Sequence, residues 1–198
     1  MYNLKAESRN TNLKVKKLRE EGIIPGCVYG GSLKETLLIQ LQHKDVIQLL
    51  KLKTIGGQVV LNVKGKKILA LLKEINLNPV TNRVIHLSFQ NLIENEFVTS
   101  TALIILANED KITDFIRQSL FDISYKALPS HIVEEITIDM EGMKLGSIVR
   151  VEDLEIAKNK DIEILIPHDT MIINIVEQNK GKQADEVEDE EVVSDSIE

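Results

Sequence analysis

The sequence predicts a mainly β protein made of a small N-terminal barrel, a second β-rich domain and an acidic tail. Short runs of alternating apolar and polar residues recur along the chain and are separated by glycine and proline. A chain of 198 residues with 43% hydrophobic residues is long enough to form two cores. The sign of the charge changes near the middle. We therefore expect domains at residues 1–92 and 93–176, followed by a disordered tail at 177–198.

Several short strands and one helix in the first half are typical of a small barrel. Strands are predicted at residues 2–7, 26–30, 36–42, 58–64, 68–77 and 83–90, the first of them an edge strand. Apolar residues from Val46 to Leu52 recur at helical spacing, so a helix is predicted at 43–53. Residues 11–21 mix Leu and Val with Lys and Arg, which favours a basic loop ending in one helical turn.

The residue pattern of the second half predicts short strands and one helix. Strands are expected at residues 97–107, 136–140, 147–151, 161–166 and 171–176, and a helix at 112–121. Residues 177–198 contain 9 acidic and 2 basic residues and no aromatic residue. Such a segment buries too little surface to offset its chain entropy, which predicts disorder.

Charge divides the chain into two unlike halves. Residues 1–92 carry 15 Lys or Arg against 6 Asp or Glu, a net charge of +9. Residues 93–198 carry 9 against 25, a net charge of −16. Asymmetry of this kind indicates that only the first half faces a polyanion.

The reactive residue types are too few and too scattered for an enzyme. Cys27 is the only cysteine, so no internal disulfide forms and a reducing compartment is expected. The four histidines make no metal-binding spacing, and the glycine pairs at 30–31 and 56–57 are interpreted as turns. Neither a secretory segment nor an apolar run of about 18 residues occurs. We expect a soluble cytoplasmic protein with no cofactor, metal, membrane segment, small-molecule substrate or catalysis.

A cluster of cations in the first half is the strongest candidate for binding a polyanion. Its members are Arg9, Lys14, Lys16, Lys17 and Arg19, and Tyr29 follows them. Cationic donors bind phosphate, while a tyrosine ring stacks on a base or donates its hydroxyl. A solvated lysine-rich loop with Tyr29 in the core would give the same pattern. The +9 charge of the half favours nucleic acid.

The strand predicted at 83–90 carries a second polar group. A period of two places Val84, His86 and Ser88 on one face, and the preceding strand offers Lys73 and Asn76. A lone strand histidine is more often a packed or surface residue than a ligand. Its polar neighbours nevertheless predict a donor-rich surface suited to the groove of an RNA helix.

Three motifs follow one another along the chain. The first is KLREEGIIPGCVYG at residues 17–30, and the second is NPVTNRVIHLSF at 78–89. The third spans residues 127–154 and contains ALP, ITIDM, LGSI and VEDL. They span about 140 residues, from 17 to 154, and in this order they resemble the ribosomal protein family L-twenty-five, also called Ctc. The sequence departs from the family at Thr11, Asn12 and Leu13, where glycines are usual, and at Ser88, where an acidic residue is usual.

The resemblance implies the long two-domain general-stress form, with a six-stranded N-terminal barrel that binds 5S rRNA. The RNA contacts that it carries over by position are Lys16, Lys17, Arg19, Tyr29, Lys73, Asn76, His86 and Ser88. The partners expected are 5S rRNA, the large ribosomal subunit and neighbouring ribosomal proteins, with the chain a monomer off the ribosome. The alternative function is a stress-related protein-interaction module that uses the acidic half, with RNA binding incidental.

Overall fold

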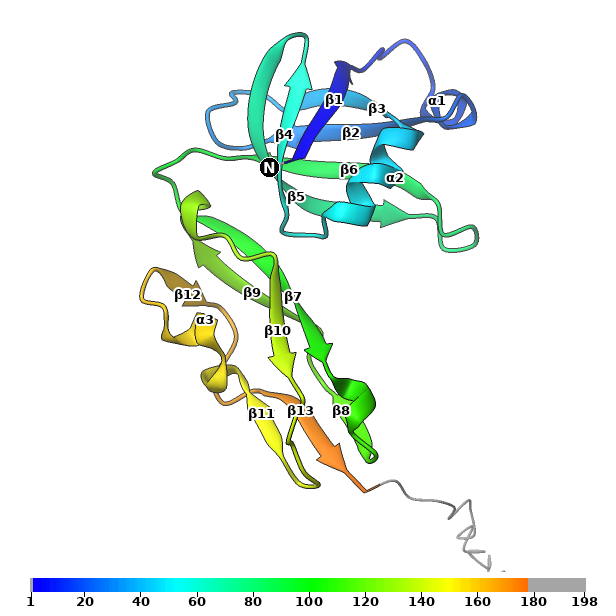
Figure 1. Ribbon diagram of the computed structural model, residues 1–198. Helices are drawn as coiled ribbons and strands as arrows, with labels where there is room; N and C mark the ends of the chain where they lie inside the picture. The colour runs from blue at the N-terminus through cyan, green and yellow to red at the C-terminus, as the bar shows by residue number, and fades with distance from the viewer. Residues whose placement is uncertain (1, 178–198) are drawn as a thin grey trace, which may run out of the picture.

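The computed structural model describes residues 2–177, and the first half of these forms a closed six-stranded barrel (Figure 1). The strands are β1 (Tyr2–Ser8), β2 (Ile23–Tyr29), β3 (Leu37–Gln42), β4 (Gln58–Val63), β5 (Lys66–Leu77) and β6 (Val84–Asn91). Their order around the barrel is β1-β3-β2-β6-β5-β4. The tail predicted at 177–198 lies outside the described residues, apart from Glu177.

Pairing of β1 on both sides closes the barrel. Strand β1 runs antiparallel to β3 through Glu7 and Ser8 and parallel to β4 from Tyr2 to Ala6. The prediction of an edge strand here was therefore wrong, because closure leaves β1 no free edge. Alternate residues of each strand, such as Leu4 and Ala6, point inward and pack in one core with Phe89.

Two helices cover parts of the barrel. Helix α1 (Val15–Glu20) buries Leu18, in agreement with the predicted basic loop that ends in a helical turn. Gly22 then adopts a φ of +74° and starts the chain into β2, which begins three residues earlier than predicted. Helix α2 (His43–Leu52) agrees with prediction and packs Val46 and Leu49 into the core.

The second β-rich domain consists of two sheets over a separate core. Strands β7 (Val98–Ala107), β9 (Asp122–Ala127), β10 (Glu135–Asp139) and β12 (Ile162–Ile164) form one sheet in the order β10-β7-β9-β12. Strands β8 (Phe115–Gln118), β11 (Ile148–Arg150) and β13 (Met171–Val176) form the other in the order β11-β13-β8. The short helices are η1 (Glu109–Lys111), η2 (Pro129–His131), η3 (Val151–Asp153) and α3 (Glu155–Lys158).

The helix predicted at 112–121 was wrong, because this segment contains strand β8. Ile112, Ile116 and Leu120 pack against the second core. A spacing of four residues returns to the same face of a helix and also to the same face of a strand. The pattern of these three residues therefore fits both structures. Pairing with β13 determines the outcome.

A packed junction joins the two domains. Leu71 of β5, Leu92 and Val98 of β7 form a small buried cluster between them. Lys53 Nζ lies 2.5 Å from Glu134 Oε1, with both side chains about one quarter exposed or less. The packing and this partly buried ion pair connect the second domain to the barrel at the point where the chain passes from one to the other (Figure 1).

Gly56 lies at the tightest point of this junction. It has a φ of +87°, and a Cβ added to it would overlap the Thr101 carbonyl oxygen of β7. Its N–H donates to Leu72 O at 2.8 Å. The glycine pair predicted as a turn is therefore also the place where the barrel backbone approaches the second domain.

We expect Gly56→Ala to destabilise the protein more than Gly65→Ala. Gly65 has a φ of +80°, but a Cβ added there would meet nothing within 4 Å, so its replacement costs only backbone strain, about 1–2 kcal/mol. The clash with Thr101 adds about 2 kcal/mol at Gly56. Calorimetric unfolding of both variants measures the difference. Equal losses of stability would show that the close approach at Gly56 is not structurally important.

Candidate nucleic-acid interface

Polar side chains from three adjacent strands meet on the outer face of the barrel. Strand β6 lies between β2, its parallel neighbour, and β5, its antiparallel neighbour. The register places Asn76 beside His86 and Tyr29 beside Gln90. Ser88 lies between Cys27 on one side and Glu74 on the other. We call this group of side chains on β2, β6 and β5 the outer face.

Glu74 brings a carboxylate to the centre of the outer face. Ser88 Oγ donates a hydrogen bond to Glu74 Oε2 at 3.3 Å. Burial raises the pKa of Tyr29, and the neighbouring Cys27 and Glu74 raise it further. The Tyr29 hydroxyl therefore remains protonated at neutral pH and is available as a donor.

His86 is held in its neutral form. Burial lowers its pKa below 6.5, and Arg19 and Arg9 lower it further, while Glu74 acts in the opposite direction. A neutral imidazole offers one donor and one acceptor, whereas an imidazolium offers two donors. His86 therefore suits a partner with mixed polarity, such as a ribose hydroxyl or a base edge.

Arg19 joins helix α1 to the outer face. Its Nε and Nη2 both donate to the Ile85 carbonyl oxygen, at 3.0 and 2.9 Å. Two of its five donors are thus used within the protein. Arg19 fixes α1 against β6 and keeps part of its guanidinium at the rim of the outer face.

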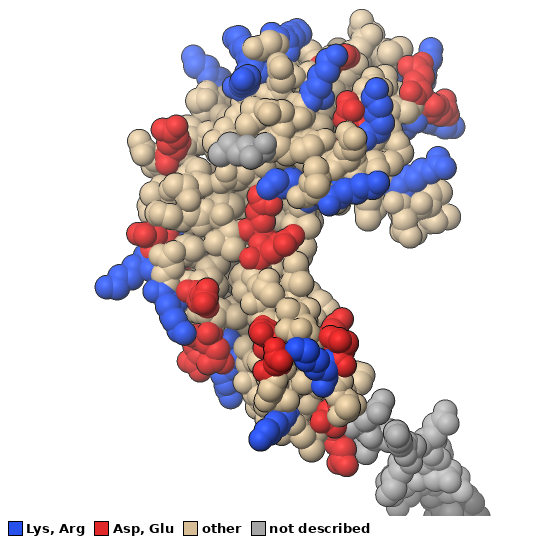
Figure 2. All heavy atoms as spheres, in the orientation of Figure 1, with Lys and Arg blue, Asp and Glu red and all other residues tan. Residues whose placement is uncertain are grey.

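The other predicted cations flank this face. Lys14, Lys16 and Lys17 are exposed on α1 or at its start. Arg9 follows β1 and donates its backbone N–H to Leu38 O at 3.0 Å. Lys and Arg side chains are prominent over the barrel in Figure 2, whereas acidic and basic groups are mixed over the second domain. The cationic surface lies where the charge asymmetry of the sequence predicts it.

Lys73 is not placed with the other candidates. A β-bulge at Lys73 shifts the register of β5 against β6 between Leu72 and Glu74. The Lys73 ammonium donates to the Thr99 carbonyl oxygen of β7 at 2.8 Å, and burial lowers its pKa. The structure therefore gives Lys73 a role in the domain junction, and RNA contact by this residue stays a prediction.

Two further placements differ from the sequence pattern. Val84 packs against the barrel core instead of sharing the face of His86, because the register shifts again between Asn76 and Leu77. Glu74 was missed as a member of the site. Strand periodicity contained the signal, since residues 74 and 76 share a face whereas 73 and 76 do not.

Neither a metal site nor a membrane helix is found in the part of the chain that the structure describes. Residues 2–177 contain no group of three or more His, Cys, Asp or Glu side chains that could hold a metal ion. Within the same range, every helix is too short or too polar to cross a membrane.

Fold and surface define a class of protein: a basic β-barrel with a polar outer face, joined to a second β-rich domain. The family model described as Ribosomal L25p family matches residues 4–89, and that described as Ribosomal protein TL5, C-terminal domain, matches residues 107–179.

Relatives match nearly the full chain. A large ribosomal subunit protein bL25 of Halothermothrix orenii is 30% identical over 204 residues, covering 97% of this chain and 90% of the relative. The bL25 protein of Pseudoalteromonas translucida is 27% identical over 197 residues, covering 96% of each. The chain belongs to the L25 family of bacterial ribosomal proteins, in its long two-domain form. Members of this family are structural proteins and not enzymes.

We expect the pKa of His86 to fall further in Glu74→Gln than in the parent protein. Glu74 is the group that raises this pKa, and removing its charge leaves burial and the two arginines to lower it. Titration of the histidine resonances by NMR measures the shift. Glu35→Gln removes an equal charge from a carboxylate that has no effect on His86 and serves as the control. A rise in the pKa of His86 in Glu74→Gln would contradict this arrangement of charges.

The same shift predicts how His86 affects stability. The unfolded chain binds a proton at this residue near pH 6.5, and the folded chain only at lower pH. The free energy of unfolding therefore falls as pH drops from 6.5 through the folded-state pKa. We expect His86→Gln to reduce this loss, which urea unfolding at pH 7 and pH 5 measures. An unchanged difference between the two pH values would remove His86 as a cause.

Proposed function

We propose that this chain is a structural constituent of the large ribosomal subunit and binds 5S rRNA through its barrel. One observation carries the proposal. The fold brings Tyr29 of β2 to the same outer face as Asn76, His86 and Ser88 of the consecutive strands β5 and β6, and Arg19 connects this face to the lysines of α1. The relatives named large ribosomal subunit protein support the assignment to that subunit.

Two parts of the barrel surface contact different parts of the RNA. Lys14, Lys16 and Lys17 are exposed and bind backbone phosphates through charge. The half-buried outer face contacts a shallow RNA groove, where ribose hydroxyls and base edges offer both donors and acceptors. Neutral His86 and protonated Tyr29 suit these partners.

Glu74 makes the outer face selective. Its carboxylate accepts a hydrogen bond from Ser88, which is itself almost fully buried, so Glu74 and not Ser88 presents the acceptor at this position. A phosphate close to Glu74 would be repelled, so the RNA backbone runs along α1 and not across the centre of the outer face. Ser88 and Glu74 together place a hydroxyl and a carboxylate where the family usually has a single acidic residue.

Chemical footprinting on 5S rRNA tests the proposal. Purified full-length protein should protect one continuous stretch of helical 5S rRNA and leave an unrelated structured RNA of similar length unprotected. His86→Ala should weaken protection at the groove while protection near the phosphates bound by α1 persists. Equal protection of both RNAs by the parent protein would overturn specific recognition of 5S rRNA.

We expect affinity for 5S rRNA to depend steeply on salt. With about five phosphate contacts, the logarithm of affinity falls with that of salt concentration with a slope of about −4. The double variant Lys16→Ala with Lys17→Ala should flatten this slope by about 1–2 because two contacts are lost. Filter binding at several salt concentrations measures it.

The matched control removes two other neighbouring cations from the same barrel. Lys66 and Lys67 are exposed at the start of β5, at the turn that follows β4, away from α1 (Figure 1). Their replacement by alanine should leave the slope unchanged. If both double variants flatten the slope equally, the charge of the whole barrel and not the α1 segment determines binding.

A further inference from the structure

Strand β10 has one free edge. Within residues 2–177 it is the end strand of its sheet and pairs only with β7, in parallel. Leu103 N–H donates to Glu134 O, and Met140 N–H donates to Ala107 O. These bonds show that even-numbered residues direct their backbone groups to β7. The odd-numbered residues of β10, among them Thr137, therefore direct their N–H and C=O groups to the free edge.

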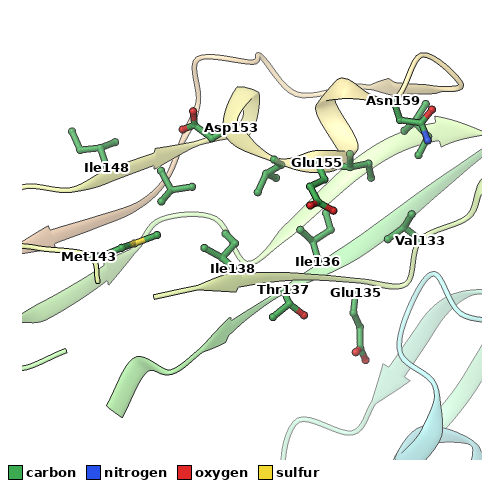
Figure 3. A pocket seen from close by; sticks show the side chains of 14 residues that line it. Val133, Glu135, Ile136, Thr137, Ile138, Met143, Ile148, Asp153, Glu155 and Asn159 are labelled. Atoms are coloured by element: carbon green, nitrogen blue, oxygen red, sulfur yellow. The ribbon is translucent and has the colours of Figure 1, made fainter. Parts of the chain in front are cut away.

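A cavity of about 780 Å³ runs along this edge. Four successive residues line it: Glu135, Ile136, Thr137 and Ile138. Successive strand residues point to opposite faces, so a cavity lined by all four follows the edge of the strand and not one face of the sheet. Figure 3 shows Ile136 and Ile138 on one side of β10, and Glu135 and Thr137 on the other.

The opposite wall comes from β11 and the short helices η3 and α3. Ile148, Leu154 and Ile156 contribute apolar surface, and Asp153 and Glu155 contribute carboxylates. In Figure 3 the Glu155 side chain points from α3 towards β10. With Glu135, three acidic residues line the cavity, and none of its lining residues is Lys, Arg or His. The chemistry is thus apolar and anionic, the reverse of the barrel surface.

We propose that the groove along the free edge of β10 binds an extended basic segment of another protein, which adds a strand to the sheet. Its backbone would bond to the free N–H and C=O groups of β10. Its alternate apolar side chains would lie on the side of Ile136 and Ile138, while its lysine or arginine side chains would lie on the other side and pair with Glu135. Glu155, on the side of Ile136 and Ile138, adds negative charge that attracts the basic segment as a whole. This function belongs to the second domain and is independent of RNA binding by the barrel.

Charge favours a basic segment in this groove over a second copy of the chain and over the chain's own residues 178–198. A second copy paired antiparallel through β10 and centred on Thr137 would place Glu135 opposite the Asp139 of its mate, which is repulsive. The chain's own residues 178–198 contain eight Asp or Glu and only two Lys, so the acidic groove repels them. RNA phosphates are repelled for the same reason.

Binding of a designed peptide to the full-length protein tests the proposal. The probe is a fluorescent ten-residue peptide of alternating valine and lysine, compared with one of alternating valine and glutamate. Anisotropy should show saturable binding of the basic peptide only. Amide exchange measured by NMR should slow at Glu135 and Thr137, whose N–H groups face the free edge, when the basic peptide is bound.

Two variants locate the site. Glu135→Lys with Glu155→Lys should weaken binding of the basic peptide at least about tenfold, because the pair with Glu135 becomes repulsive and the charge of the groove changes from negative to positive. Glu109→Lys with Glu163→Lys makes the same change of charge at positions that do not line the cavity and should have little effect. Thr137→Pro removes one edge N–H without a bond to β7 and should weaken binding as well. Should Thr137→Pro fail to fold, the charge variants still decide.

Several outcomes would overturn the proposal. These are equal affinity for the acidic and basic peptides, binding without slowed exchange at Glu135 and Thr137, and no binding at all. In the last case the carboxylates only protect an exposed strand edge from aggregation. Sedimentation that shows a dimer lost in Thr137→Pro would assign the groove to a second copy of the chain.

Discussion

Closure of the barrel through the parallel pairing of β1 with β4 is the constraint on which the rest of the structure depends. Each strand then has two neighbours, so its inward residues are committed to the core and its outward residues to the surface. The relative positions of β2, β6 and β5 follow from this closure. Tyr29, His86 and Asn76 lie on one face because these three strands are adjacent, although Tyr29 is far from the other two in the sequence.

The domain junction depends on the same strands. Strand β5 is longer than its neighbours and contributes Leu71 to the buried cluster and Lys73 to the bond with Thr99. The bulge at Lys73 separates the part of β5 that packs in the domain junction from the part that belongs to the outer face. Leu69 and Leu71 before it pack in the domain junction, and Glu74 and Asn76 after it belong to the outer face. A single irregular residue thus allows one strand to serve both surfaces.

Much of this fold was predictable because short-range patterns determine it. The six barrel strands, helix α2 and the division of charge all follow from periodicity and composition. Features that depend on pairing between strands could not be predicted from the sequence. The spacing of Ile112, Ile116 and Leu120 fits a helix and a strand equally, and the closure of β1 involves residues far away in the chain. Bulges shift the positions of Lys73 and Val84, and no local pattern marks them. RNA contact by the candidate residues stays a prediction.

The packed junction has a consequence for how a partner of the second domain would meet this protein. A flexible linker would spread that domain over a large volume and lower its effective concentration at any one position. Here the cluster around Leu71, the ion pair of Lys53 with Glu134 and the close approach at Gly56 hold the two domains in contact. Once the barrel is anchored, these contacts keep the second domain next to it. Anchoring thereby raises the local concentration of the second domain near the barrel before any partner arrives.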